Sequence, residues 1–516
     1  MVGVWDVTAP KAPFPHHVFA FLFDGIVLQS NPPAGNRSTS DSAAFGVWEF
    51  DGDVVQARLL EHHADPDTGV PCGSTQLTLR FTVFGNDLHG EAITTSTSGA
   101  VATTSIFGTR VSISPHRERL SAAGHRAVTD PLADLFGEIA TRASAFEQRT
   151  GKAFLSLAAG TPDTSLLPAE IYESITHRIL HVVGAQSLNY TLPQGTVAAR
   201  TAIATYLETF SITATADDLL ITNGGIEALS LATLLMLDPG DVVVTEKPGF
   251  PTLLSLFEVV GAQVVQVDDL SADGLERAIS TYQPKLVSLI PDFQNPTGSA
   301  LSAAERQRIA EVLRRHDVIA LEDATYAPLT FDGAPRHALQ SFAPDNVIYA
   351  MSASKILSPA MRIGALVAPQ WLLQKAIALK SIFNMQASAI HEAVVADFLS
   401  YNALTHIERL CETYAWRKNT MVEALRQEFS SELRVSWTDP DGGMFLWLTA
   451  PETVNFTKLL PAALENGVAY VPGSYFYSRH TEVPENGARL NFASMPDDLI
   501  PEAVGRLADV IKAELP

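Results

Sequence analysis

From about residue 127 onward, short apolar runs alternate with longer helical stretches, and this alternation leaves few architectures open. Strands that alternate with helices of this length predict an α/β layer built on a mainly parallel sheet. Residues 391–429 read as a long helical stretch, and short strands and a final helix follow, which is typical of an α+β domain. The apolar runs of the layer are DLLIT, DVVVTE, KLVSLIP, VIALED, VIYAMS and IGALVAP.

The first 115 residues have another periodicity. Runs such as VFAFLF, VVQARLLEHH and STQLTLRFTVFG are short and β-rich, and Asp24-Gly25, Asp51-Gly52 and Gly85-Asn86-Asp87 are turn signals between runs. Six or more closely spaced strands predict an antiparallel barrel or sandwich. The pattern GVWDV…GVWEFDGD…LTLRFTVFGNDLHG resembles the small calycin-type barrels of bacterial proteins.

These patterns predict the domain organisation. We expect a β-barrel-like domain over 1–115, a linker and a first helix over 116–150, a large domain over 151–385 and a small domain over 386–516.

Acidic residues outnumber basic ones by 57 to 35, so the formal net charge is −22. Nucleic acid and an anionic membrane surface would repel such a chain. No apolar stretch reaches the ~18 residues of a membrane span, and the first residues lack the flank of a signal peptide. Cys72 and Cys411 are too few for a disulfide scaffold. We expect a soluble cytoplasmic protein with no nucleic-acid or membrane partner.

Histidines gather in the N-terminal region, at His16-His17, Glu61-His62-His63 and His89. Adjacent residues of a strand point to opposite faces, so His62 and His63 do not converge. Solvated strand faces explain this pattern more simply than a metal cluster, and we predict no metal.

The segment VIYAMSASKILSPAMRIGALVAP places Lys355 just after a buried strand, among small residues. Desolvation and nearby cations lower the pKa of a lysine and make its amine a nucleophile toward carbonyls. Ser352, Ser354 and Arg362 are polar groups suited to a phosphate. The alternative is a surface turn with an ordinary lysine.

Two further strand ends carry polar residues. Asn295, in an Asn-Pro-Thr-Gly turn, lies at the edge of a parallel sheet where α/β enzymes bind ligands, although it is also compatible with a simple turn. Asp323 ends the run VIALED and Tyr326 follows it. A carboxylate there can keep a heteroaromatic nitrogen protonated, or it can merely cap the next segment.

The run LLIT leads into Gly224-Gly225 and a helix. Two glycines let the backbone approach a phosphate at a helix N-terminus, where free N–H groups favour anions. Phe250, after the next strand, can stack on a planar ring, although such a residue is more often part of a core.

These four segments occur in order, each at a strand end, with 28 residues from Asn295 to Asp323 and 32 from Asp323 to Lys355. Together with LSLAAGTPDTSLLP, YTLPQGTVAAR, DPGDVVVTEKPGFP and ARLNFAS, they resemble the fold type I pyridoxal-phosphate enzymes, in particular the aminotransferase class I/II family. The resemblance covers about residues 127–516. It implies a mainly parallel seven-stranded sheet in the large domain, an α+β small domain, and pyridoxal 5′-phosphate as cofactor.

The resemblance also implies roles for individual residues. Lys355 would bind the cofactor as an aldimine and later shuttle the α-proton, while Asp323 would keep the pyridine nitrogen protonated so that the ring acts as an electron sink. Asn295 and Tyr326 would hydrogen-bond the ring hydroxyl oxygen, and Phe250 would stack on the ring.

The remaining roles concern the phosphate and the substrate. The phosphate would be bound by the backbone of Gly225 and Ile226, by Ser352, Ser354 and Arg362, and by Tyr190 of the neighbouring subunit. Arg489 would clamp the substrate α-carboxylate as a bidentate pair, beside Asn295 and the backbone of Gly160. Active sites of this family lie at a subunit interface, which implies a homodimer.

Two departures from the family pattern bear on the reaction: Ile226 allows only a backbone contact with the phosphate, and Phe250 replaces the commoner tyrosine. We expect an aminotransferase that acts on an α-amino acid and a keto acid. An alternative is β- or γ-elimination, replacement or carbon–carbon bond formation in specialised metabolism, on a substrate such as S-adenosylmethionine. A third reading is a regulator with a DNA-binding helical module, but the front region lacks a basic recognition helix.

Overall fold

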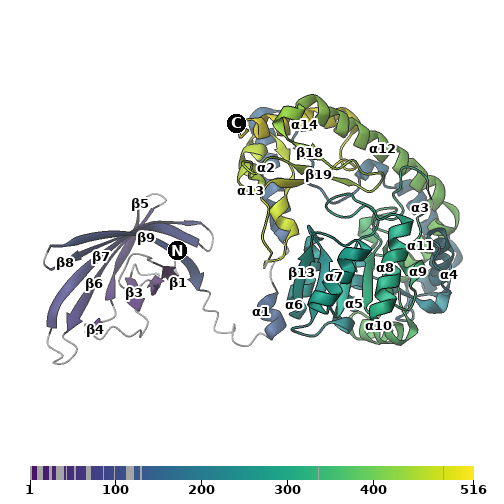
Figure 1. Cartoon of the computed structure of the whole chain (residues 1–516), viewed down its shortest axis with the longest axis horizontal. Helices are drawn as coiled ribbons and strands as arrows, with labels where there is room; N and C mark the ends of the chain where they lie inside the picture. The colour runs from purple at the N-terminus through teal and green to yellow at the C-terminus, as the bar shows by residue number, and fades with distance from the viewer. Residues whose placement is uncertain are drawn as a thin grey trace. The chain divides into compact units, whose positions relative to one another are not determined.

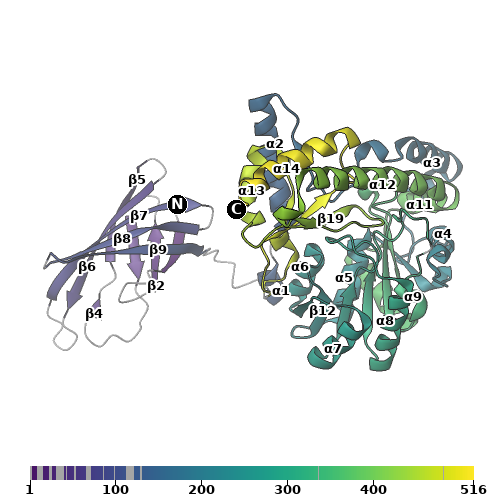
Figure 2. The ribbon, with the colours of Figure 1, turned by 45° about the horizontal axis from the view of Figure 1, so that its top comes forward.

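The computed structural model describes residues 3–8, 16–21, 26–30, 40–41, 44–51, 54–64, 71–84, 87–97, 99–111, 121–127, 131–334, 336–479 and 481–515. The chain divides into two compact units, Met1–Ser121 and Ala122–Pro516 (Figures 1 and 2).

The described part of the first unit is all-β, as predicted. Its strands form one antiparallel sheet in the order β4-β6-β5-β3-β2-β1-β9-β8-β7, and β6 pairs with β7 as well. Alternate residues of the long strands, such as Leu77, Leu79 and Phe81, are buried in a common apolar cluster. The strands are β1 (Gly3–Thr8), β2 (His16–Phe21), β3 (Ile26–Ser30), β4 (Ser40–Asp41), β5 (Ala44–Asp51), β6 (Val54–Ala64), β7 (Pro71–Phe84), β8 (Asp87–Ser96) and β9 (Val101–Val111).

The second unit is built on a seven-stranded sheet with the order β11-β17-β16-β15-β14-β12-β13. All of its neighbouring pairs are parallel except the two that involve β17. The predicted mainly parallel sheet is therefore confirmed. The strands are β11 (Leu219–Thr222), β12 (Val242–Glu246), β13 (Gln263–Val267), β14 (Leu286–Leu289), β15 (Ile319–Asp323), β16 (Val347–Ser352) and β17 (Gly364–Val367).

Both faces of this sheet are covered by helices, which explains why six of its seven strands, all but the edge strand β13, read as continuous apolar runs. Successive residues of one strand enter different cores: Val243 packs with α5, α6 and α10, and Val244 packs with α7, α8 and α9. The helices are α5 (Gly225–Met236), α6 (Pro251–Val260), α7 (Ala272–Tyr282), α8 (Ala303–His316), α9 (Leu339–Phe342) and α10 (Gln370–Phe383) (Figure 1).

The C-terminal region contains a second, smaller sheet. Four strands pair antiparallel in the order β18-β19-β22-β21, and β10 pairs with β20 in parallel. The strands are β10 (Leu155–Ser156), β18 (Ser436–Trp437), β19 (Phe445–Thr449), β20 (Val468–Ala469), β21 (Val471–Pro472) and β22 (Gly487–Asn491).

The long helical stretch predicted over residues 391–429 is two helices, because the backbone at Asn402 departs from helical geometry. The helices outside the large sheet are α1 (Ala122–Arg126), α2 (Pro131–Thr150), α3 (Ala169–Val182), α4 (Val197–Leu207), α11 (Ala389–Tyr401), α12 (Ala403–Glu428), α13 (Phe456–Glu465) and α14 (Ile500–Lys512). Among the described residues, no helix is long and apolar enough to cross a membrane.

Candidate active site

The predicted site residues meet at one edge of the seven-stranded sheet. Strands β11, β14, β15 and β16 all end at this edge, because the ends of parallel strands coincide there. The segments that follow these ends converge on a single pocket. It is lined by every predicted residue except Tyr190, namely Gly160, Gly225, Ile226, Phe250, Asn295, Asp323, Tyr326, Ser352, Ser354, Lys355, Arg362 and Arg489.

Lys355 lies in the turn after β16, and its Nζ donates a hydrogen bond to the carbonyl oxygen of Gly160 at 2.7 Å. Burial, together with the positive charges of Arg489 and Arg362, lowers the pKa of this amine to about 8, against the opposing charge of Asp323. The pKa moves in the direction expected for a nucleophilic lysine.

Asp323, the last residue of β15, is buried and lines the pocket. Its Oδ1 accepts hydrogen bonds from the backbone N–H of Thr325 at 3.0 Å and from the Thr325 hydroxyl at 2.6 Å. Burial nevertheless raises the pKa of Asp323, against these bonds and the charge of Lys355. A buried carboxylate in this position calls for a cationic partner in the pocket.

The N-terminus of α5 is surrounded by a concave group of residues, which we call the cup. It contains Gly224, Gly225 and Arg362. Gly224 has a φ of +81°, and a Cβ there would lie 2.3 Å from an Arg362 terminal nitrogen, so the position requires glycine. Arg362 donates to the Ser354 hydroxyl at 3.4 Å and to the Asn223 carbonyl at 3.2 Å. The cup combines a guanidinium, two serines and the free N–H groups of a helix N-terminus, which suits a phosphate.

Arg489 projects from β22 into the pocket and is 1% exposed. Its guanidinium carbon lies 4.2 Å from the ring centroid of Phe445 and 5.4 Å from that of Phe476. One terminal nitrogen donates to Asn295 Oδ1 at 3.0 Å and the other to the Ala158 carbonyl at 2.8 Å. These bonds use two of the five N–H groups of the guanidinium, and its buried Nε has no partner among the described residues, so donors remain for an anionic ligand.

Tyr326 completes the group around Asn295. Its hydroxyl hydrogen-bonds the Asn295 side chain, and burial raises the pKa of the phenol, which keeps it protonated as a donor.

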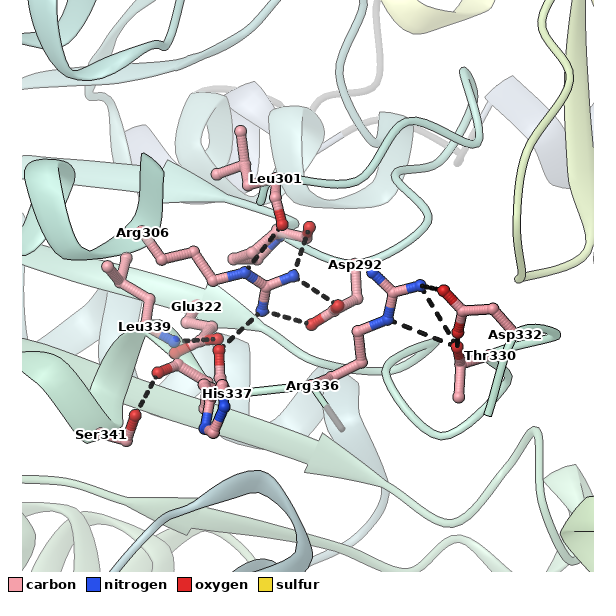
Figure 3. A network of polar contacts seen from close by, with 12 residues as sticks. Asp292, Leu301, Arg306, Glu322, Thr330, Asp332, Arg336, His337, Leu339 and Ser341 are labelled. Carbon is pink, nitrogen blue, oxygen red and sulfur yellow. Dashed lines mark hydrogen bonds and ion pairs between the residues drawn. The ribbon is translucent and has the colours of Figure 1, made fainter. Parts of the chain in front are cut away.

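The loop that carries Asn295 is fixed to α8 by a buried ion pair, which Figure 3 shows from close by. Arg306 contacts both carboxylate oxygens of Asp292, at 2.8 and 2.5 Å, and also donates to the carbonyls of Pro291, Leu301 and His337. Both side chains of the pair are almost fully buried. The pair therefore joins both ends of the loop to one helix.

Tyr190 does not line the pocket of its own chain and is 77% exposed. Conversely, the pocket includes residues that the motifs did not predict: Leu132 and Phe136 of α2, Leu229, Ile290 and Thr325. The sequence could have indicated Thr325 as a pocket residue, because its hydroxyl-bearing side chain comes two residues after Asp323. The α2 residues carry only the i, i+4 spacing of an amphipathic helix, which gives no information about a pocket.

The described residues contain no group of three or more His, Cys, Asp or Glu side chains arranged to hold a metal ion.

A comparison with protein families identifies residues 152–507 as matching the model "Aminotransferase class I and II". The chain belongs to this family. It is 34% identical over 373 residues to aromatic-amino-acid aminotransferase 1 of Thermococcus litoralis, across 70% of this chain and 88% of the relative. It is 31% identical to the 2-aminoadipate transaminase of Thermus thermophilus, across 71% of this chain and 92% of the relative.

Solved structures agree with this assignment. The kynurenine aminotransferase of Pyrococcus horikoshii superposes with a TM-score of 0.71 at 28% identity, across 79% of this chain and all of that structure. The second unit thus has the fold type I architecture, and the protein is a pyridoxal-phosphate-dependent enzyme of the aminotransferase family.

The pocket fits pyridoxal 5′-phosphate on its own geometry. A Cβ at Gly225 would lie 3.1 Å from the Cβ of Ser352, a tight contact, so glycine at this position leaves more space in the cup. Asp323 offers the carboxylate that a protonated ring nitrogen needs, and Lys355 offers an amine for the aldehyde.

Proposed function

We propose that the protein transfers the amino group of an α-amino acid to a keto acid, with Lys355 moving the proton at the substrate α-carbon. The observation that carries this proposal is the convergence of Lys355, Asp323 and Arg489 on one pocket. The bound cofactor supplies the electron sink that amino-acid side chains lack.

Each of these residues has a distinct task in the proposal. The Lys355 amine has a lowered pKa, so it is poised to accept the α-proton near neutral pH and to return it. Arg489 binds the α-carboxylate, and its unpartnered Nε supports this role. Asp323 holds the proton of the ring nitrogen, and Asn295 and Tyr326 donate to the ring hydroxyl oxygen. Gly225, Ile226, Ser352, Ser354 and Arg362 bind the phosphate.

The test is an absorbance titration of the holoenzyme with single amino acids, followed by keto acids. We expect a suitable donor to remove the visible band of the lysine-bound cofactor and a keto acid to restore it. The Lys355→Ala variant should lose turnover by at least about 10³-fold, because it lacks both the attachment point and the proton carrier. Release of a leaving group with no keto-acid requirement would instead establish elimination or replacement.

We further infer that the enzyme works as a homodimer in which Tyr190 reaches the phosphate of the partner subunit. The inference is supported by an apolar surface around this tyrosine, where Leu188 and Leu192 are 69% and 67% exposed. The Thr191 backbone N–H donates to Gln386, so this loop lies beside the exposed end of α10, where Ile382 is 78% exposed.

For the first unit we infer a closed barrel of calycin type. The support is the pairing pattern: β1 pairs with β2 and β9, β6 pairs with β5 and β7, and each of the other long strands also has two neighbours. A sheet whose long strands all have two partners is closed on itself, and among the described strands only the two-residue strand β4 pairs on one side, with β6.

A further inference from the structure

We propose that the substrate side chain lies against an apolar wall formed by Leu132, Phe136 and Ile290, so that the enzyme prefers amino acids with large apolar side chains to those with a second carboxylate. This proposal rests on the proposed aminotransferase function and names its substrate class. The relatives named above include both an aromatic-amino-acid and a 2-aminoadipate enzyme, so their names do not decide between these classes.

The wall comes from α2 and from the residue after β14. Leu132 and Phe136 lie one helical turn apart in the first half of α2, Leu132 buried and Phe136 half-buried, and both line the pocket. Ile290 is 3% exposed and lines the same pocket.

Helix α2 lines the same pocket as Arg489. Leu132 and Phe476 belong to one apolar cluster, and Phe136 and Tyr475, the latter from the segment Gly473–Phe476, pack against it. Burial raises the pKa of Tyr475, and the negative charges of Glu138 and Asp134 on α2 contribute to the same shift. Phe476 of that segment packs on the Arg489 guanidinium. A substrate held at its α-carboxylate by Arg489 therefore has α2 as a neighbour.

Among the described residues that line the pocket, no cation remains to pair with a second carboxylate of the substrate. The cations of the pocket, among the described residues that line it, are Lys355, Arg362 and Arg489, and the cofactor, its phosphate and the α-carboxylate occupy all three. The charges of α2 in this region are acidic: Asp134 and Glu138 are exposed on the helix. A side-chain carboxylate would be desolvated without a partner, whereas a phenyl or isobutyl group would gain apolar contact.

The first experiment measures binding without chemistry. Holoenzyme is titrated by calorimetry with 3-phenylpropionate and with glutarate, two carboxylates that lack the amino group. We expect 3-phenylpropionate to bind about tenfold to a hundredfold more tightly, the range over which an apolar pocket discriminates. Equal or tighter binding of glutarate overturns the proposal and places an additional cation, such as one from a partner subunit, at the side chain.

Two variants of one residue test the wall itself. Phe136→Ala should reduce the preference for 3-phenylpropionate by about tenfold. Phe136→Arg should reverse the preference, because it supplies the missing cation at a half-buried position. Thr141→Ala, on the exposed side of the same helix, should leave both affinities unchanged. If Phe136→Ala and Thr141→Ala behave alike, α2 does not contact the side chain.

These outcomes separate the two proposals. If no amino acid converts the bound cofactor but 3-phenylpropionate still binds preferentially, the proposed transamination is wrong and the proposed apolar wall is supported. If phenylalanine and glutamate serve as donors with equal kcat/KM, the proposed transamination is supported and the proposed apolar wall is wrong.

Discussion

Lys355 differs from an ordinary lysine because its amine is inside a pocket that already contains two guanidinium groups. Burial, Arg489 and Arg362 all favour the neutral amine, and Asp323 alone opposes them. The balance places the pKa at about 8, so that roughly a tenth of the amine is neutral at pH 7. For an unperturbed lysine, with a pKa of about 10.4, the neutral fraction is roughly a thousandth or less.

This pKa predicts the pH dependence of cofactor capture. Only the neutral amine attacks an aldehyde, so the rate at which apoprotein captures pyridoxal phosphate should rise with pH and level off above about 8. Stopped-flow absorbance measures this rate. Asp323→Asn should move the midpoint to lower pH, because it removes the charge that favours the ammonium form. A rate that still climbs tenfold per pH unit beyond about 9 would show an unperturbed amine.

Sequence patterns indicated the site residues at the strand ends, but they did not indicate Arg489. Lys355, Asp323 and Asn295 each follow a recognisable buried strand, and the geometry of a parallel sheet then brings them together. Arg489 lies inside the strand β22, and its place between Phe445 and Phe476 depends on the packing of the small domain. Only the family resemblance singled it out.

At the scale of elements, the site depends on how its loops are attached to helices. The loop that carries Asn295 has no regular structure of its own, and the buried pair Asp292–Arg306 ties it to α8 (Figure 3). A buried pair contributes little relative to an apolar substitute, but loss of one partner leaves an uncompensated charge.

We therefore predict that Arg306→Met destabilises the second unit by about 3–5 kcal/mol in equilibrium urea unfolding of the apoprotein. The double variant Asp292→Leu/Arg306→Met should recover most of this loss, because the uncompensated charge of Asp292 is removed. As a matched surface control, Arg277→Ala should cost at most about 1 kcal/mol, since both its side chain and that of Asp269 are largely exposed. Equal losses for Arg306→Met and the double variant would contradict the assigned role of the pair.

The helices and strands themselves were predictable wherever the local sequence pattern determines the secondary structure. Apolar runs indicated six of the seven strands of the large sheet, because both faces of these strands are covered. The edge strand β13, QVVQV, was not among these runs, since it contains two glutamines and is partly exposed. The contribution of α2 to the pocket was not predictable, since its apolar spacing fits any core-facing helix. The division at Asn402 was missed because a single non-helical residue barely disturbs the periodicity.

At the scale of the whole molecule, one predicted site residue lies outside the pocket of its own chain. Tyr190 points from an exposed loop, and apolar side chains surround it on the surface. A surface of this kind is typical of an interface, and in a homodimer it would bring Tyr190 to a second pocket. No pattern within one chain predicts such a placement, because it depends on a second copy.

The proposed homodimer predicts that subunit association and cofactor affinity fall together. Leu188→Glu/Leu192→Glu places two charges in the apolar surface, and their desolvation should weaken association by at least about a hundredfold. Sedimentation velocity over a dilution series measures association, and titration of apoprotein with pyridoxal phosphate measures affinity. The monomeric variant should bind the cofactor several-fold more weakly, because Tyr190 of the partner subunit no longer reaches the phosphate. Trp416→Glu, at an equally exposed apolar residue of α12, should change neither quantity. A dissociated variant with undiminished cofactor affinity would remove Tyr190 from the phosphate site, and a variant that stays dimeric would place the interface elsewhere.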